Sequence, residues 1–197
     1  MRYFITGARG QLGATLVDML PEDSVSAIDL PEYDVTDIEA VRHAFDGQTV
    51  DVVIHCAAYT DVDGCARNPE MANLVNAIGT RNIAHICAEY GAAMVLLSTN
   101  EVFDGRKPYS YTEQDIPGPI NPYGESKLAA ERYALDILER YYIVRTSWMY
   151  AAGGANFVHT ILTLASQGQD ISVVTDELGA PTCAQDLASA IIELVDR

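Results

Sequence analysis

The sequence predicts an α/β fold, a doubly wound parallel sheet followed by the start of a second, smaller lobe. Three observations lead to this prediction. Short apolar strands alternate with amphipathic helices along most of the chain. Two of the strands, Val50–Ile54 and Ala93–Leu97, are continuous apolar runs of the kind that parallel sheets bury on both faces. A glycine-rich turn separates the first strand from the first helix, so we expect right-handed strand–helix–strand units.

Length and composition fit one soluble domain. The 197 residues suffice for a full core, and 49% hydrophobic with 20% charged residues is ordinary for a globule. The net charge of −16 disfavours binding to nucleic acid or to anionic membranes. We see no leader and no long apolar run, and we expect a cytoplasmic protein. Four scattered cysteines without a C-x-x-C pair favour reduced thiols and predict no metal site.

The first strand, Tyr3–Thr6, leads into a loop with Gly7, Gly10 and Gly13, and then into a helix that ends at Pro21. Glycines at these positions allow a tight turn, let a pyrophosphate approach the backbone N–H groups, and let the helix pack closely on the strand. The pattern is typical of a Rossmann-like dinucleotide-binding domain.

The second strand, Ser24–Ile28, ends at Asp29, which is 22 residues after Gly7. A carboxylate at this position accepts hydrogen bonds from the ribose hydroxyls and repels a 2′-phosphate, which favours NAD. Arg9 in the glycine loop is able to pair with that phosphate instead. NADH and NADPH therefore both stay open as the cofactor.

The segment Asp34–Asp37 places an acidic residue beside the adenine region and begins a helix that runs through Phe45. Thr36 or Asp37 is expected to cap this helix.

The third strand, Val50–Ile54, runs into His55 and then into Ala57 and Ala58. These small residues let a cofactor lie against the chain. His55 is better read as a satisfied structural histidine than as a base, since it sits at a strand end without a triad partner.

A long helix from Pro69 to Tyr90 carries Asn76 in its middle, either as a solvated or core-bridging amide or as a contact to the strand that carries the active site. The strand Ala93–Leu97 then brings Thr99 to the carboxyl edge of the sheet, where open α/β sheets bind ligands. A hydroxyl there can bond a carbonyl oxygen.

Asn121 and Pro122 are suited to begin a helix, so that Tyr123 and Lys127 share one of its faces. We expect the Lys127 ammonium to lower the pKa of the Tyr123 phenol from its usual value of about 10, so that the phenol exchanges a proton with a substrate oxygen. The preceding loop, 107–120, is rich in Pro, Gly and Tyr and is expected to face the substrate.

Residues 1–150 are predicted to form the dinucleotide-binding domain. Residues 151–197 are predicted to form a partial substrate lobe and a helix that returns to that domain. The boundary is placed near Gly153 and Gly154. The elements expected around it are a strand at Tyr142–Arg145, a helix at Asn156–Gln167, a strand at Ile171–Val174 and a helix at Asp186–Val195.

Eight short stretches spread over nearly the whole chain resemble the extended short-chain dehydrogenase/reductase family, and within it the dTDP-4-dehydrorhamnose reductases. They are Gly10–Gly13, Asp34–Asp37, Ala57–Thr60, Val75–Thr80, Val102–Gly105, Asn121–Gly124, Arg145–Trp148 and Gly179–Thr182.

The resemblance implies that Thr99, Tyr123 and Lys127 are the catalytic residues. It implies NADH or NADPH as the cofactor, contacted by Gly7, Arg9, Gly10, Gln11, Leu12, Gly13, Asp29, Asp34, Val35, Ala57, Ala58, Tyr59, Asn76, Tyr123 and Lys127. It places the substrate, a 4-keto-6-deoxy sugar nucleotide, beside Asn100, Glu101, Trp148 and Asn156. The implied activity is NAD(P)H-dependent reduction of that substrate in dTDP-rhamnose biosynthesis.

The chain departs from the reductase pattern at Asn100-Glu101, where those enzymes usually have Asp-Tyr. Thr99-x-Glu101 is similar to the sugar-nucleotide 4,6-dehydratases, although Asn100 cannot donate a proton as a carboxylic acid does. Family members also run about a hundred residues further. A dehydratase or epimerase, and a non-catalytic regulatory subunit that binds NAD(P), stay open as alternatives, as does a homodimer.

Overall fold

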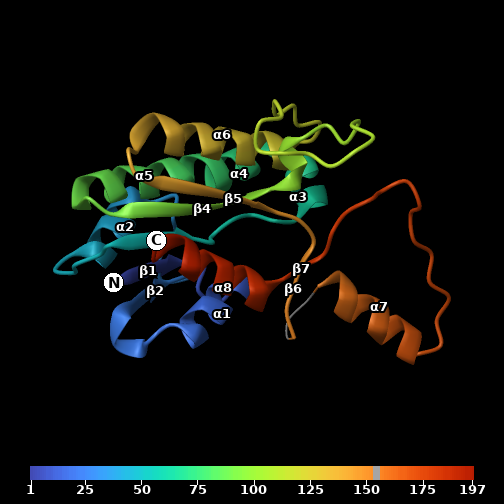
Figure 1. Ribbon diagram of the computed structural model, residues 1–197, viewed down its shortest axis with the longest axis horizontal. Helices are drawn as coiled ribbons and strands as arrows, with labels where there is room; N and C mark the ends of the chain where they lie inside the picture. The colour runs from blue at the N-terminus through green and yellow to red at the C-terminus, as the bar shows by residue number, and fades with distance from the viewer. Residues whose placement is uncertain (153–155) are drawn as a thin grey trace.

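The computed structural model describes residues 1–152 and 156–197. Within them, one sheet of five parallel strands has the order β2-β1-β3-β4-β5 (Figure 1). The strands are β1 (Tyr3–Thr6), β2 (Val25–Ile28), β3 (Val52–His55), β4 (Ala93–Thr99) and β5 (Tyr141–Thr146). The predicted α/β architecture with a parallel sheet is therefore confirmed.

Helices cover both faces of this sheet (Figure 1). The side chains of α2 (Ile38–Phe45), α5 (Gly79–Tyr90) and α6 (Pro122–Ile137) share one core cluster with Phe4, Val53 and Met94. The side chains of α1 (Gln11–Met19) and α8 (Ala184–Val195) share another with Ile5, Ile54 and Val95. Alternate residues of each strand thus point to opposite cores, which explains the continuous apolar runs.

The register of the strands brings the predicted site residues to one edge. Thr6 pairs with His55, and Thr99 pairs with Thr146. The strand order reverses between β1 and β3, the position where open α/β sheets form a ligand crevice.

The predicted helix from Pro69 to Tyr90 is continuous but not uniform. It consists of α4 (Pro69–Ala72), a π-helical segment η2 (Asn73–Ile78) and α5. It is preceded by α3 (Val62–Arg67), which sequence reasoning missed. Two short 3₁₀ turns, η1 (Glu22–Ser24) and η3 (Asn100–Val102), complete this part of the chain.

The chain after β5 forms a two-stranded pair, β6 (Met149–Tyr150) with β7 (Thr182–Cys183), and between them the helix α7 (Phe157–Ser166). The predicted strand at Ile171–Val174 is wrong, because this segment is not a strand and none of the described strands pairs with it. The last helix begins at Ala184, two residues earlier than expected. Gly153 and Gly154, near the predicted boundary, lie outside the described residues.

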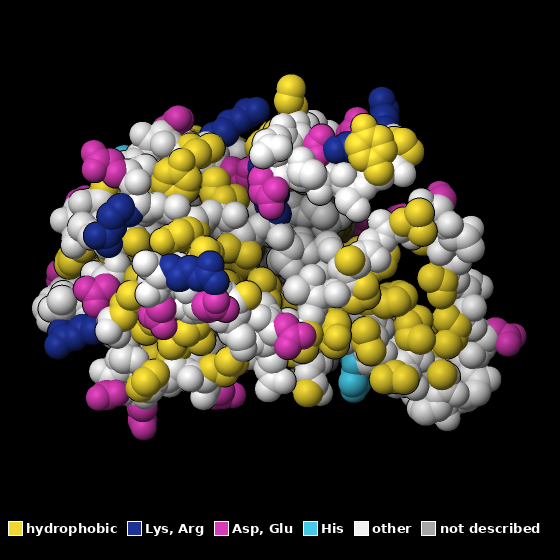
Figure 2. Space-filling view, in the orientation of Figure 1, with side chains coloured by type: hydrophobic (Ala, Val, Ile, Leu, Met, Phe, Trp, Pro, Cys, Tyr) yellow, Lys and Arg dark blue, Asp and Glu magenta, His cyan; other side chains and the backbone are white. Residues whose placement is uncertain are grey.

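Apolar side chains are exposed along α7 and the segment after it. Phe157, Leu162 and Val174 are each more than 60% exposed, and Leu178 is 96% exposed. Figure 2 shows hydrophobic side chains gathered over this part of the molecule. A patch of this kind indicates a surface that another element covers.

In the part of the chain that the structure describes, no helix combines the length and the apolar character needed to cross a membrane.

Candidate functional site

The glycine loop between β1 and α1 is packed so tightly that side chains are excluded. Gly7 has a φ of 69°, and a Cβ there would lie 2.6 Å from the backbone nitrogen of Ala57. A Cβ on Gly13 would collide with the carbonyl oxygen of Gly7 and lie 2.8 Å from Cα of Ala8. The loop therefore leaves the start of α1 close to the sheet edge, where a helix N-terminus attracts an anion.

A hollow of about 210 Å³ lies beside this loop, at the carboxyl end of β2. Arg9, Asp29, Glu32 and Tyr33 are among its lining residues. Asp29 is held in place because its two carboxylate oxygens accept the backbone N–H groups of Arg9 (2.6 Å) and Leu30 (2.7 Å). That the hollow holds an adenosine ribose stays a prediction.

The backbone of the segment Asp34–Thr36, which was predicted to lie beside the adenine, is also fixed. Asp34 accepts the N–H of Thr36 (2.9 Å), and the Asn82 amide donates to the carbonyl of Val35 (3.0 Å). Asp37, one of the two expected caps, is the residue that caps α2.

Asn76 bridges two parts of the site. Its amide accepts the N–H of Tyr59 (2.7 Å) and donates to the carbonyl of Tyr59 (3.0 Å) and to Oγ of Ser126 (2.9 Å). Ser126 in turn donates to the carbonyl of Tyr123. Asn76 is thus the core-bridging amide that the sequence allowed, and it ties the Ala57–Tyr59 turn to α6.

Thr99, Tyr123 and Lys127 come together at the carboxyl edge of the sheet. Thr99 ends β4, and its hydroxyl lies near the phenol of Tyr123 in the first turn of α6. One turn later, Lys127 is only 3% exposed. Burial lowers the pKa of Lys127 to about 8, so its ammonium stays charged at neutral pH.

The expected lowering of the Tyr123 pKa is wrong for the protein without ligands. Burial raises the pKa of Tyr123 to about 12, and the Thr99 hydroxyl offsets this only in part. The reason is that removing the charged phenolate from water costs more free energy than its interactions with the surrounding residues supply. The phenol therefore carries its proton at neutral pH, as a proton donor must.

His55 is confirmed as a structural residue. Its Nδ1 lies 2.7 Å from Oγ1 of Thr6 and its Nε2 lies 3.1 Å from Oγ1 of Thr80. Thr80 donates its own proton to the carbonyl of Asn76, so it must accept one from Nε2. Burial lowers the pKa of His55 to about 3, which keeps the ring neutral.

A buried ion pair beneath the site was missed by sequence reasoning. Glu131 is 2% exposed, and its carboxylate accepts two bonds from the Arg145 guanidinium (2.9 and 2.6 Å) and one from the hydroxyl of Ser98. It joins α6, β4 and β5 one turn after Lys127. The available signal was a charged residue four positions after Lys127, on the same face of the predicted helix.

Thr146 was also missed. Its Oγ1 is buried, and no described residue serves as its hydrogen-bond partner. Because Thr146 is the register partner of Thr99, its hydroxyl lies at the same sheet edge.

On the expected substrate side, Asn100 and Glu101 bond to their neighbours. Asn100 donates to Glu101 (2.9 Å), and Glu101 also accepts a bond from Asn121 (2.7 Å), the cap of α6. A Cβ on Gly124 would collide with the carbonyl of Glu101, so η3 is packed tightly on the start of α6.

Trp148 and Asn156 lie further along the chain. Trp148 has a φ of 45°, is 43% exposed, and its indole packs over Gly179. Asn156 caps α7 by accepting the N–H of His159 (2.9 Å). A contact of either residue with substrate stays a prediction.

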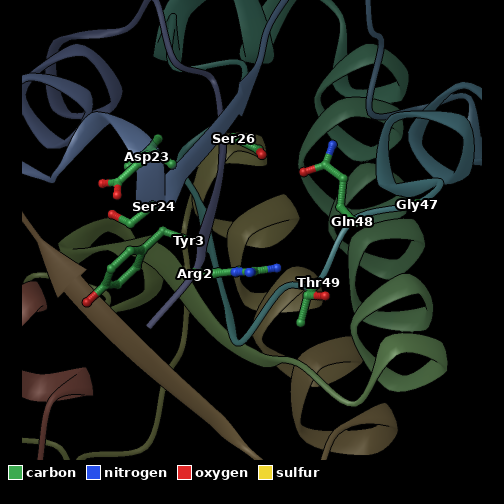
Figure 3. A pocket seen from close by; sticks show the side chains of 9 residues that line it. Arg2, Tyr3, Asp23, Ser24, Ser26, Gly47, Gln48 and Thr49 are labelled. Atoms are coloured by element: carbon green, nitrogen blue, oxygen red, sulfur yellow. The ribbon is translucent and has the colours of Figure 1, made fainter.

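A second hollow of about 210 Å³ opens at the opposite, amino edge of the sheet (Figure 3). Residues at the starts of β1 and β2 and the loop 47–49 line it, and Tyr3, Ser26 and Gln48 are among them. It includes no predicted site residue.

Comparison with known proteins gives consistent matches. The chain is 41% identical over 201 residues to dTDP-4-dehydrorhamnose reductase of Mycolicibacterium smegmatis, a match that covers 99% of this chain and 60% of that relative. It superposes on the dTDP-4-dehydrorhamnose reductase of Bacillus anthracis in complex with NADP with a TM-score of 0.95 and 40% identity, covering 100% of this chain and 71% of that one.

A dTDP-glucose 4,6-dehydratase from Streptomyces venezuelae has a TM-score of 0.88, with 100% of this chain and 72% of that one covered. At 21% identity it shows only a shared fold.

The chain spans 60% of the length of the relative from Mycolicibacterium smegmatis. Residues 1–197 match a single family, and the chain belongs to it: the family described as the RmlD substrate binding domain.

Proposed function

We propose that this chain carries the cofactor site and the catalytic residues of an NAD(P)H-dependent reductase that acts on a 4-keto-6-deoxy sugar nucleotide, as a dTDP-4-dehydrorhamnose reductase does. One observation carries the proposal. Thr99, Tyr123 and the buried Lys127 meet at the sheet edge that also holds the glycine loop. Residues 1–150 serve as the dinucleotide-binding domain in this proposal, and residues 151–197 supply part of the substrate lobe and the helix α8, which packs back on that domain.

In the proposed reaction, NAD(P)H supplies a hydride to the carbonyl carbon of the sugar. Thr99 bonds the carbonyl oxygen, and Tyr123 gives that oxygen its proton as the C=O double bond becomes a C–O single bond. The positive charge of Lys127 favours the phenolate that remains. Solvent then returns a proton to Tyr123.

The pyrophosphate and ribose are assigned to residues that fit them. The glycine loop accommodates a backbone-bound anion because it has no room for side chains, and Asp29 is fixed beside the hollow. The neighbouring Arg9 is able to accept a 2′-phosphate, so both NADH and NADPH suit the site.

The alternatives are less well supported. A dehydratase uses an acid where this chain has Asn100, whose amide cannot donate a proton in that way. A purely regulatory subunit has no need for a buried lysine beside a protonated tyrosine. The relatives above 35% identity cited above are reductases by name.

The decisive experiment is product analysis with purified chain, NADPH and dTDP-4-keto-6-deoxy sugar. The comparison form is the same chain extended by the remaining third of a relative. We expect both forms to bind NADPH, and the extended form to yield the 4-hydroxy sugar much faster, because the added chain should help to orient the substrate and to exclude water at the reacting carbonyl. Cofactor binding without product from the extended form would contradict reductase activity.

Replacing Asp29 by alanine should weaken NADH binding more than NADPH binding. The carboxylate is expected to accept a bond from the 2′-hydroxyl, which only NADH has, and to repel the 2′-phosphate of NADPH. A shift of the affinity ratio by about tenfold is expected from one charge-assisted hydrogen bond. Calorimetric titration with each cofactor measures it.

Asp51→Ala is a matched control for this substitution, because Asp51 also accepts a backbone N–H, from Arg2, but lies before β3 at the amino edge of the sheet. Equal losses for both cofactors in the Asp29 variant would mean that Asp29 does not read the ribose.

A further inference from the structure

We propose that Glu32 sets the cofactor preference of the chain by competing with a ribose 2′-phosphate for Arg9. This inference rests on the proposed function, since it concerns the same dinucleotide site. It assigns a role to a residue outside the glycine loop and outside the end of β2.

The geometry places the competing groups in one hollow. Nη2 of Arg9 lies 3.1 Å from Oε2 and 3.3 Å from Oε1 of Glu32, and Nη1 donates to the carbonyl of Leu30. Arg9, Glu32 and Asp29 all line the hollow at the end of β2. The guanidinium that would bind a phosphate is therefore already occupied.

The charges make this occupation selective. The hollow contains two carboxylates, Asp29 and Glu32, against one cation, Arg9. A 2′-phosphate carries a charge near −2 and prefers the bidentate face of a guanidinium. The phosphate can use Arg9 only if Glu32 gives up its bonds to the guanidinium. Even then, the negative charge of Glu32 stays near the phosphate and repels it. The 2′-hydroxyl of NADH does not need to displace Glu32 from Arg9 and is not repelled by its negative charge.

Because the Arg9–Glu32 pair is exposed, we expect Glu32 to weaken NADPH binding rather than to prevent it. The side chains of Arg9 and Glu32 are 62% and 57% exposed, and exposed ion pairs exchange partners at little cost. Glu32 therefore shifts the preference toward NADH while leaving NADPH able to bind.

Glu32 is also a cleaner position to test than Asp29. The Asp29 carboxylate holds the backbone N–H of Arg9, so its removal disturbs the glycine loop itself. The Glu32 carboxylate bonds the Arg9 side chain rather than a backbone group of the glycine loop, so Glu32→Gln changes the charge while leaving the loop intact.

The test compares 2′,5′-ADP with 5′-AMP, which differ only in the 2′-phosphate and do not depend on sugar reduction. For Glu32→Gln we expect the affinity for 2′,5′-ADP to rise about threefold to tenfold, with the affinity for 5′-AMP unchanged. Arg9→Gln should do the reverse and lower only the affinity for 2′,5′-ADP.

Glu39→Gln is the matched control. Glu39 forms an exposed ion pair with Arg42 on α2, does not line the hollow, and its substitution removes the same charge. We expect its ratio of affinities to equal that of the unaltered chain. An unchanged ratio in Glu32→Gln, or an equal rise in Glu39→Gln, would overturn the role of Glu32. Failure of the unaltered chain to bind either nucleotide would overturn the dinucleotide site itself.

Discussion

Tyr123→Phe should lower turnover by about 10²- to 10⁴-fold, the range that a positioned proton donor contributes. The phenol is protonated in the free protein, with its pKa raised to about 12, and it sits beside Thr99 at the sheet edge. Phenylalanine keeps the ring and removes only the proton. Affinity for NADPH should stay within a few-fold, because the glycine loop and Asp29 are untouched. Steady-state turnover of the extended form, beside calorimetry with NADPH, measures both quantities.

Tyr133→Phe is the control for this prediction. Tyr133 lies on the same helix, three turns further along, where its ring meets the guanidinium of Arg81. Its hydroxyl has no part in the proposed reaction, so turnover should not change. Near-normal turnover in Tyr123→Phe would remove the phenol from the mechanism and leave Thr99 as the remaining hydroxyl at the carbonyl.

Gly13→Ala should abolish tight cofactor binding. The added methyl group would overlap the carbonyl oxygen of Gly7 and approach Cα of Ala8 to 2.8 Å, and both are backbone atoms that cannot rotate away. Either α1 moves off the loop or the loop opens. Overpacking of this kind costs about 1–3 kcal/mol, which corresponds to a loss of affinity of about fivefold to more than a hundredfold if it falls on the bound state.

The control for this substitution is Gly118→Ala. Gly118 has no described atom within 4 Å of an added Cβ, and its φ is not positive. The same methyl group there should leave both thermal stability and NADPH affinity unchanged. Thermal unfolding and calorimetry of the two variants separate a folding defect from a binding defect. Normal NADPH affinity in Gly13→Ala would show that the close approach of α1 is dispensable.

Much of the architecture could be predicted because it depends on local pattern. Apolar runs such as Val50–Ile54 are typical of strands that a parallel sheet buries on both faces, and the loop from Gly7 to Gly13 has few conformations open to it. The cap at Asn121 placed Tyr123 and Lys127 on one face of α6. These features required no knowledge of distant contacts.

The features that sequence reasoning missed depend on contacts between distant segments. The Glu131–Arg145 pair joins α6 to β5, and the pKa of Tyr123 is set by how deeply the folded chain buries the ring. The apolar run Ile171–Val174 has strand propensity, yet a strand needs a partner, and the described residues provide none there. Propensity alone could not reveal that missing neighbour.

The short pairing of β6 with β7 has a consequence for how such a protein changes over evolutionary time. Met149 lies opposite Thr182 and Tyr150 opposite Cys183, so the chain departs from the sheet domain and returns to it at one place. Each doubling in the length of a flexible segment whose ends are joined costs only about 0.6 kcal/mol. The excursion between these strands can therefore be lengthened, trimmed or exchanged with little effect on the five-stranded sheet. Mutation can thus change this segment between the two strands while the five-stranded sheet is inherited unchanged.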